Sequence, residues 1–249
     1  MRKFFVKNEN ISGNIAKIVG EDVKHIKNVL RLLQNDIIIV CDEDGKNYEA
    51  KITSIDKDEV QTLILRELDN TTEPDINITV FQCLPKSDKM ELIIQKCTEL
   101  GVIEFTPVSS ENVVVSLDSS KAEKKITRWQ KIAEEAAKQS KRSRIPKINN
   151  IIDLNEIKDC IFDKDLVLLA YEKEEGNGIR EVISKLDHSV IKDIAIIIGA
   201  EGGFTENEVE NLKKISNLKS ISLGPRILRT ETAGIVLAGI VLYEFNEMG

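Results

Sequence analysis

The most constraining feature of the sequence is a change of rhythm near residue 75. From there on, short apolar segments typical of strands alternate with helical segments. Near-continuous apolar runs that alternate with helices are typical of a parallel sheet buried on both faces. The sequence therefore predicts an α/β domain over residues 73–249, with strands at Ile76–Cys83, Ile103–Ser109, Leu166–Ala170, Ile194–Ile198 and Ser220–Leu223.

The helices between these strands have apolar stripes and recognisable ends. Asp88 and Glu91 stand at capping-box spacing and open a helix that stops at Gly101. Thr205 and Glu208 are predicted to cap a second helix in the same way. The stripe of the first helix consists of Met90, Ile93, Ile94, Cys97 and Leu100.

The final helix, predicted over about Thr232–Phe245, is apolar nearly all round. Such a helix is either central in a large core or half of a subunit interface. The second alternative is favoured because the domain is small for a fully internal helix. The sequence therefore predicts a homodimer through the C-terminal helix.

The first 72 residues have a different pattern. Short segments rich in β-branched residues follow one another at 37–41, 48–55 and 60–65, and one or two helical turns interrupt them around Asp22–Leu33. This pattern predicts a small β-barrel or sandwich over residues 1–72. The polar stretch Asp69–Pro74 is predicted to be a linker to the second domain.

Composition excludes several classes of protein. The net charge of −7 argues against a surface coated in positive charge, so a nucleic-acid contact must be local. Four widely spaced cysteines and two histidines predict neither a disulfide framework nor a metal site, and the cysteines are expected to be buried. The longest apolar run, Ala233–Tyr243, is too short to span a membrane. With no signal-peptide pattern, a cytoplasmic protein is expected.

Three segments place glycine or an unusual turn directly after a predicted strand. They are residues 168–172, 198–204 and 223–233, and Gly199, Gly202, Gly203 and Gly224 lie within them. Ligands of open α/β sheets bind at the carboxyl ends of the strands, so three such loops predict one pocket. Ordinary strand-to-helix turns are the alternative. No P-loop or complete GxGxxG motif is present, and Glu175–Gly178 is only a fragment in a polar stretch.

Residues 199–204 (GAEGGF) and 223–233 (LGPRILRTETA) resemble the signature loops of the SPOUT methyltransferases. Within that group, the chain resembles the ribosomal RNA small subunit methyltransferase E family along its whole length. Residues 25–31 (HIKNVLR) resemble the PUA-like N-terminal domain of the family. Residues 85–86, 89–91 and 96–101 resemble its first catalytic-domain helix, and residues 128–129 and 134–140 resemble a further segment of the family. Ala200 and Asn35 depart from the usual Pro and Gly of the family.

The resemblance implies a small PUA-like β-barrel, followed by a parallel sheet with a deep C-terminal trefoil knot. It also implies a homodimer that uses S-adenosyl-L-methionine to methylate uridine N3 in small-subunit (16S) ribosomal RNA. An RNA-binding protein with an inactive knot, or a knotted enzyme for tRNA or a ribose 2′-hydroxyl, are the alternatives. The implied cofactor-binding residues are Leu169, Ala170, Gly199, Glu201, Gly202, Gly203, Leu223, Gly224, Ile227, Leu228, Thr232 and Ala233.

The reaction suggests roles for three charged residues in these loops. Uridine N3 carries a proton at neutral pH, so a base or an anion-stabilising cation must assist its methylation. Arg229 is predicted to stabilise the developing anion, and Glu201 or Glu231 to take the proton. The alternative for Glu231 is that it caps the final helix and pairs with Arg229.

A basic segment supplies a candidate RNA contact despite the acidic total. Residues 121–147 contain ten Lys and Arg against three Glu. Such a patch can bind phosphate without sequence preference, although a charge run is more commonly a solvated helix face. The predicted RNA-binding residues are His25, Arg31, Lys86, Lys138, Lys141, Arg142 and Arg144.

Overall fold

The computed structural model describes residues 2–69, 72–112 and 119–248. The chain forms two compact units, and each is described by itself. The first unit comprises residues 1–73 together with 137–144, and the second comprises residues 74–136 and 145–249. The sequence predicted a division after residue 72 and did not anticipate that 137–144 belongs with the first unit. Residues 70–71 of the predicted linker lie outside the described residues.

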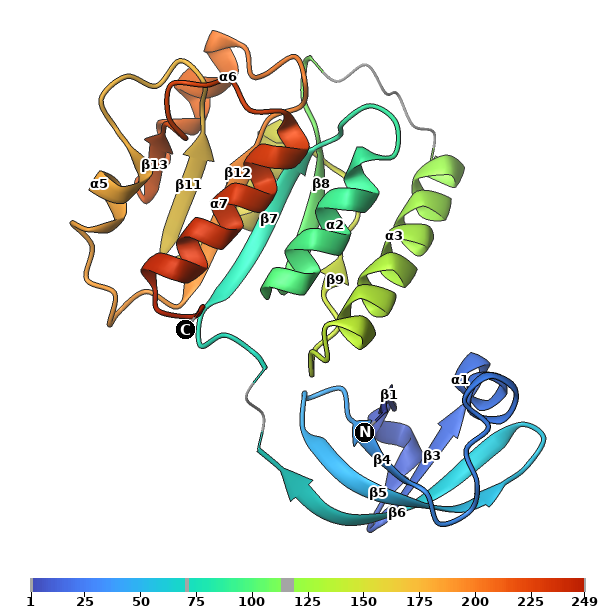
Figure 1. The fold of residues 1–249 in the computed structure, drawn as a ribbon. Coiled ribbons are helices and arrows are strands. Elements are labelled where there is room, and N and C mark those ends of the chain that lie inside the picture. Colours follow the sequence, from blue (N-terminus) through green and yellow to red (C-terminus); the bar gives the residue numbers. More distant parts are fainter. Residues whose placement is uncertain (1, 70–71, 113–118, 249) are drawn as a thin grey trace. The chain divides into compact units, whose positions relative to one another are not determined.

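The first unit is built on a six-stranded mixed sheet that curls around its core, as Figure 1 shows. Its strand order is β1-β4-β5-β6-β3-β2, with β1 parallel to β4 and the other pairs antiparallel. Alternate residues such as Ile38, Val40, Ala50 and Ile52 fill the core. The strands are β1 (Lys3–Phe5), β2 (Ile11–Ser12), β3 (Ile15–Val19), β4 (Ile37–Cys41), β5 (Asn47–Ile55) and β6 (Glu59–Leu68).

The helical turns predicted around Asp22–Leu33 are present in two pieces. Helix α1 (Glu21–Lys24) runs into a π-helical segment, η2 (His25–Leu30), and a 3-10 turn, η1 (Asn8–Asn10), lies earlier in the unit. The segment ends at Arg31, whose φ of 52° is left-handed and stops a helix. Val23 and Ile26 pack into the core.

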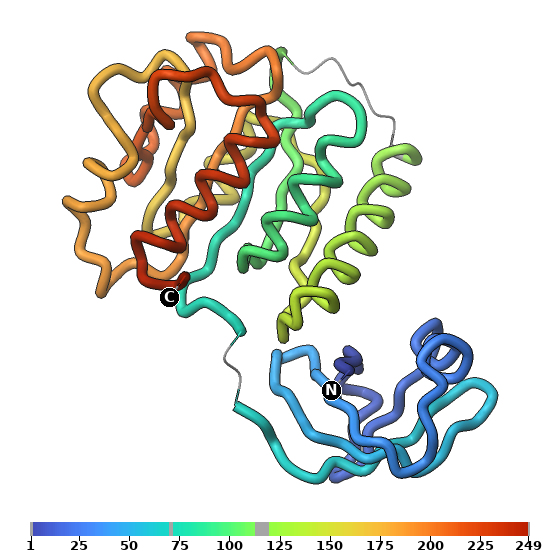
Figure 2. The backbone as a smooth tube through the Cα atoms, viewed as in Figure 1, coloured from blue at the N-terminus to red at the C-terminus, as the bar shows by residue number. Residues whose placement is uncertain are grey.

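The second unit contains the predicted parallel sheet, and every strand pair in it is parallel. The strand order is β10-β8-β7-β12-β11-β13, and β9 also pairs with β8. Figure 2 shows that the central neighbours β7 and β12 come from distant parts of the chain. The strands are β7 (Asn77–Cys83), β8 (Glu104–Ser109), β9 (Lys147–Ile148), β10 (Ile152–Asp153), β11 (Leu166–Ala170), β12 (Asp193–Ile198) and β13 (Leu218–Ile221).

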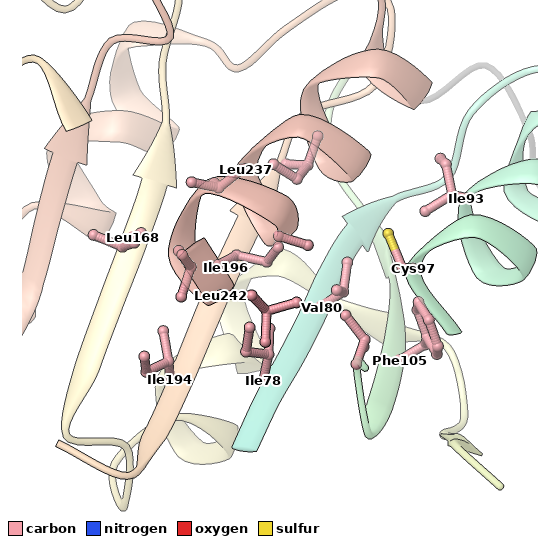
Figure 3. Packing of buried hydrophobic residues seen from close by; sticks show 14 of the residues in the cluster. Ile78, Val80, Ile93, Cys97, Phe105, Leu168, Ile194, Ile196, Leu237 and Leu242 are labelled. Carbon is pink, nitrogen blue, oxygen red and sulfur yellow. The ribbon is translucent and has the colours of Figure 1, made fainter. Parts of the chain in front are cut away.

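Helices cover both faces of this sheet, as its apolar strands predicted. Alternating side chains of β12 show the two faces: Ile194 and Ile196 belong to one core cluster, and Ala195 and Ile197 to the other. The first cluster lies under α2, α3, α5 and α7, and Figure 3 shows Leu237 and Leu242 of α7 against Ile78, Val80 and Ile196. The second lies under α4, η3 and α6. The helices are α2 (Lys89–Leu100), α3 (Ser119–Gln139), η3 (Leu154–Glu156), α4 (Ile157–Cys160), α5 (Ile179–Ile183), α6 (Glu206–Leu212) and α7 (Thr230–Glu244).

The two predicted capping boxes have different outcomes. Thr205 and Glu208 form both reciprocal hydrogen bonds at the start of α6. At α2, however, the Asp88 side chain makes no cap bond, and the Glu91 carboxylate pairs with Arg128 of α3 instead, at 2.8 Å. A carboxylate near a guanidinium gains more from that charge-assisted pair than from an exposed backbone amide.

Helix α7 begins two residues earlier than predicted. Gly234, Leu237, Ala238, Val241 and Leu242 face the sheet and are buried. Val236 and Tyr243 remain 36% and 66% exposed on the opposite side. The helix is therefore part of the core on one side and uncovered by this chain on the other.

The cysteines follow the prediction with one exception. Cys41, Cys83 and Cys97 are buried and free, whereas Cys160 at the end of the short helix α4 is exposed, which corrects its assignment to the core. No helix within residues 2–69, 72–112 and 119–248 is both long and apolar enough to cross a bilayer.

Candidate functional site

A cavity of about 710 Å³ lies in the second unit where the predicted loops follow β11, β12 and β13. This volume is typical of a pocket for a small organic ligand. The residues around it come from the carboxyl ends of these three strands, the start of α2 and the start of α7. The structure therefore brings the three predicted loops to one pocket.

Most of the predicted cofactor-binding residues line this cavity, but Leu169, Gly202 and Thr232 do not. Leu169 is fully buried in the core cluster on the α6 side of the sheet. Gly202 faces Asn112, and Thr232 is exposed on α7. The predicted residues that line the cavity are Ala170, Gly199, Glu201, Gly203, Leu223, Gly224, Ile227, Leu228 and Ala233.

Two of the predicted glycines at the cavity have backbone conformations that other residues adopt with strain. Gly203 has a φ of 63° and Gly224 a φ of 103°. A Cβ at Gly203 would also lie 3.1 Å from a carboxylate oxygen of Glu172. Glycine is therefore required at both turns by the backbone itself.

Buried hydrogen bonds tie the loops of the pocket together. Thr230 Oγ1 donates to the Gly199 carbonyl at 2.6 Å and accepts from Gln82 Nε2 at 2.9 Å. Gln82 is fully buried in β7. These bonds join the end of β7, the loop after β12 and the first turn of α7. Neither Gln82 nor Thr230 was predicted as a site residue, although a glutamine within an apolar strand is a signal that it has a polar partner.

The later part of the loop after β11, residues 174–178, forms another wall of the cavity that was not predicted. Gly176 and Gly178 line the cavity, although their GNG sequence was interpreted as a mere fragment of a nucleotide motif. The Ser222 N–H donates to the Asn177 carbonyl at 2.8 Å, which joins this loop to the end of β13. Lys213 of the turn after α6 pairs with Glu174 at 3.0 Å and fixes the loop from the other side.

Four alternating charges form a chain beside the cavity, and three of them, Lys89, Glu201 and Arg229, line it. The Lys89 Nζ lies 2.7 Å from Glu201 Oε1 and 3.5 Å from Glu231 Oε2. The Glu231 Oε1 lies 4.0 Å from Arg229 Nη1. Both Glu201 oxygens also lie 3.2 Å from the backbone N–H of Lys86. Lys89 was not among the predicted site residues.

The pairing of Lys89 with Glu201 affects both ionisations. Its hydrogen bond to Glu201 raises the pKa of Lys89. Burial raises the pKa of the Glu201 carboxyl, but the hydrogen bonds from Lys89 and from backbone N–H groups outweigh it, so this pKa lies below its ordinary value. Both groups are therefore held in their charged forms at neutral pH.

The basic residues predicted to bind RNA fall into two groups. Arg142 is 2% exposed, and its Nη2 lies 2.6 Å from Glu73 Oε2 within the first unit. Lys138 pairs with Asp22 at 3.0 Å. A guanidinium held inside by a carboxylate is not accessible to phosphate, so Arg142 is a structural residue and its prediction as an RNA contact is corrected.

The other predicted RNA contacts are on the surface. His25, Arg31, Lys141 and Arg144 are exposed in the first unit, and Lys86 is exposed in the second. Within the parts of the chain that the structure describes, no group of three His, Cys, Asp or Glu side chains is arranged to hold a metal ion.

Comparison with known proteins agrees with this architecture. Residues 72–242 match the family described as RNA methyltransferase domain, and residues 18–65 match the RNA methyltransferase PUA domain. The ribosomal RNA small subunit methyltransferase E of Bacillus subtilis (strain 168) is 37% identical over 249 residues, with 98% of this chain and 97% of the relative covered. The corresponding protein of Aquifex aeolicus (strain VF5) is 32% identical over 237 residues, with 94% and 96% covered.

A solved structure is also similar over nearly the whole chain. It is the ribosomal RNA small subunit methyltransferase E from Neisseria gonorrhoeae bound to S-adenosyl methionine, which is 31% identical with a TM-score of 0.84. The match covers 98% of this chain and 97% of that one. Fold and pocket thus define the class, an RNA methyltransferase domain that follows a PUA domain. The chain belongs to the ribosomal RNA small subunit methyltransferase E family.

Proposed function

We propose that this protein transfers a methyl group from S-adenosyl-L-methionine to N3 of a uridine in small-subunit (16S) ribosomal RNA. The single observation that carries the proposal is the cavity formed by the loops after β11, β12 and β13 in a chain of this family. A relative 31% identical over nearly its whole length binds S-adenosyl methionine. Methyl transfer needs little covalent help from the protein because the sulfonium is already activated.

The residues around the cavity fit this cofactor. The volume of about 710 Å³ suits a nucleoside with a short amino-acid tail. Gly224 has open space where a Cβ would stand, so a ligand can approach its backbone closely, and Leu223, Leu228 and Ala233 supply apolar surface for an adenine ring. Bound cofactor supplies the electrophilic methyl carbon, and the three loops hold and orient it.

The C-terminal trefoil knot implied by the family resemblance is part of this proposal. Strand β13 lies at one edge of the sheet, beyond β11, whereas α7 packs on β12 and β7 nearer the centre. The connection from β13 to α7 therefore returns across the carboxyl ends of β11 and β12. Such a return supports a knotted passage around the cofactor loops.

The proposed reaction also needs charge beside the target base. Uridine N3 is protonated at neutral pH, and the anion formed from it shares its charge with the two ring carbonyl oxygens. Arg229, whose side chain is 78% exposed at the cavity, is proposed to stabilise that anion. Glu201 and Glu231 are the carboxylates beside it, and both contact Lys89.

Exposed basic residues are proposed to hold the RNA backbone. His25, Arg31, Lys141 and Arg144 provide them in the first unit, and Lys86, whose backbone N–H lies 3.2 Å from Glu201, provides one in the second. Contacts of this kind bind phosphate and depend on salt rather than on sequence. The acidic net charge of −7 confines such binding to these local regions.

A cytoplasmic homodimer through α7 is also proposed. Thr232, Val236, Gly239 and Tyr243 recur at helical spacing on the side of α7 turned away from the sheet. Several of them are apolar, and Val236 and Tyr243 are exposed in the single chain. Light scattering is expected to report twice the chain mass of 28.0 kDa, and a wild-type monomer at micromolar concentration would contradict this arrangement.

The test of the proposed function is mass spectrometry of ribosomal RNA nucleosides from cells that lack the protein. The expected result is the loss of N3-methyluridine from the small-subunit RNA and its return on complementation. Unchanged N3-methyluridine with a loss from tRNA, or a loss of a ribose-methylated nucleoside, would identify a different substrate. Absence of S-adenosyl-L-methionine binding by calorimetry would identify an RNA-binding protein with an inactive knot.

A further inference from the structure

Lys89 is the cation most firmly held at the cavity. It stands in the first turn of α2, and its ammonium group is bound from two other elements, by Glu201 of the loop after β12 and by Glu231 of α7. Its side chain is 27% exposed, against 78% for Arg229. A cation anchored in this way is preorganised, whereas Arg229 must lose side-chain freedom to adopt one position.

The carboxylates of Glu201 and Glu231 both form ion pairs with Lys89. Glu201 accepts from Lys89 Nζ and lies within 3.2 Å of the Lys86 N–H through both oxygens. Glu231 Oε2 is buried and accepts no hydrogen bond from the described residues, and its close charged neighbour is Lys89 at 3.5 Å. Glu231 itself does not line the cavity. These contacts suit carboxylates that hold a lysine better than carboxylates that meet a nucleobase.

The geometry of the proposed reaction also favours a cation over a base. The N3–H bond lies in the plane of the uracil ring, and the lone pair left after its ionisation points in the same direction. The methyl carbon must approach along that direction, so a base that remained beside N3 would block it. Proton loss must therefore come first, and the enzyme must stabilise an anion whose charge lies on the flanking oxygens O2 and O4.

From this juxtaposition we propose that Lys89 is a catalytic residue that contacts a ring oxygen of the target uracil, and that Glu201 and Glu231 are its positioning residues. The inference rests on the proposed function. The N3 proton passes to water, the N3 lone pair forms the bond to the methyl carbon, and the carbon–sulfur bond breaks with its electron pair on sulfur. Lys89 remains protonated throughout and compensates the charge of the uracil anion.

This role predicts a defect that depends on the acidity of the substrate. In single-turnover methylation at neutral pH, Lys89→Met should lower the rate about 100- to 1,000-fold, the usual cost of one preorganised charge-stabilising donor. The rate of this variant should rise about tenfold per pH unit where the wild-type rate has levelled off, because more uridine is then ionised. Lys89→Arg should recover part of the rate, because it keeps the charge but not the shape of the ammonium.

A chemical substitution in the RNA separates catalysis from structure. Fluorine withdraws electrons and makes N3–H more acidic, so RNA with 5-fluorouridine at the methylated position should restore about tenfold or more of the Lys89→Met rate. Fluorine NMR of this RNA on the protein without cofactor gives a readout independent of turnover. The bound base should ionise at a lower pH on the wild-type protein than on Lys89→Met.

The controls distinguish failure of this inference from failure of the proposed function. Lys96→Met removes a lysine from the same helix, where it pairs with Glu99 at 2.9 Å away from the cavity, and should leave the rate unchanged. If wild-type protein makes no N3-methyluridine, the proposed function is wrong. If it does and Lys89→Met keeps the wild-type rate, or loses rate without a change in the pH profile or 5-fluorouridine rescue, Lys89 is structural and the inference is overturned.

Discussion

The two units each contain a cluster of charged side chains, and the clusters are built in opposite ways. In the first unit, the Arg142 side chain is 2% exposed. The Glu73 carboxylate accepts hydrogen bonds from the Arg142 guanidinium and from the Ser143 N–H. In the second unit, the row of alternating charges Glu201, Lys89, Glu231 and Arg229 lies beside the cavity and ends in the exposed Arg229. One buried oxygen of Glu231 receives no hydrogen bond from the described residues. Breaking a buried, hydrogen-bonded ion pair destabilises a fold, whereas charges left incomplete at a cavity can act on a ligand.

The largest effect is expected on the unfolding free energy, when the buried Arg142–Glu73 pair is broken. Arg142→Met leaves Glu73 without its charged partner inside the first unit, so the unfolding free energy should fall by about 3–5 kcal/mol. Denaturant unfolding measures this loss. Lys141→Met, at the exposed neighbouring position, should change it by less than about 0.5 kcal/mol. Equal stability of the Arg142 variant and the wild type would remove the distinction between the two clusters.

Loss of Arg229 should affect chemistry and leave stability nearly intact. Arg229→Ala should lower the single-turnover rate about 100- to 1,000-fold, since it removes an anion-stabilising donor at the cavity. Its melting temperature should match that of the wild type, because the side chain is 78% exposed and 4.0 Å from Glu231. Arg180→Ala, on the exposed surface of α5, is the matched control. A wild-type rate at saturating RNA and cofactor would show that Arg229 merely borders the site.

Substitution of a glycine at the cavity should have a smaller effect, and that effect should be on the affinity for the cofactor. Gly224→Val forces a β-branched residue to a φ of 103°, at a strain of about 1–3 kcal/mol, and should weaken or abolish S-adenosyl-L-methionine binding. Calorimetric titration measures the affinity. Gly178→Ala is the comparison, because Gly178 also lines the cavity but has a φ of −66° and open space around its Cβ position. Equal affinities for the two variants would show that backbone strain at Gly224 does not shape the site.

The smallest effect on stability is expected from a partly solvated ion pair of the first unit, Lys138–Asp22. Lys138 and Asp22 lie 3.0 Å apart with side chains 28% and 20% exposed. Partly solvated pairs of this kind contribute about 1 kcal/mol or less. Lys138→Ala should therefore lower the unfolding free energy far less than Arg142→Met. A loss as large as that of Arg142→Met would mean that burial does not separate the two pairs.

Sequence patterns predicted the local elements well where one segment contains all the information. The strand at 194–198 is confirmed by β12, and the cap of α6 by the reciprocal bonds of Thr205 and Glu208. The same pattern at Asp88 and Glu91 failed because Arg128, on another helix, attracts the Glu91 carboxylate. A capping motif therefore predicts a bond only where no distant charge competes for its side chain.

The predicted cavity was found because glycine-containing turns after parallel strands necessarily meet at one edge of a sheet. The membership of Lys89, Gly176 and Gly178 was not predicted: Lys89 stands in the first turn of an ordinary amphipathic helix, and the GNG sequence was set aside as an incomplete nucleotide motif. Arg142 was mistaken for a surface residue because a basic run has the same local appearance whether its members are solvated or buried. Local pattern thus predicted the position of the cavity more reliably than the charged residues that line it.

By itself the sequence determined the parallel sheet, the three loops that meet at the cavity and the family, because periodicity and motifs are properties of short contiguous segments. Only the tertiary structure decided which charged residues are structural and which border the cavity. Arg142 is 69 residues from its partner Glu73, and Lys89 is 112 residues from Glu201. The role of a charge depends on its desolvation and on the groups that face it, and both are set by chain segments that meet only after folding.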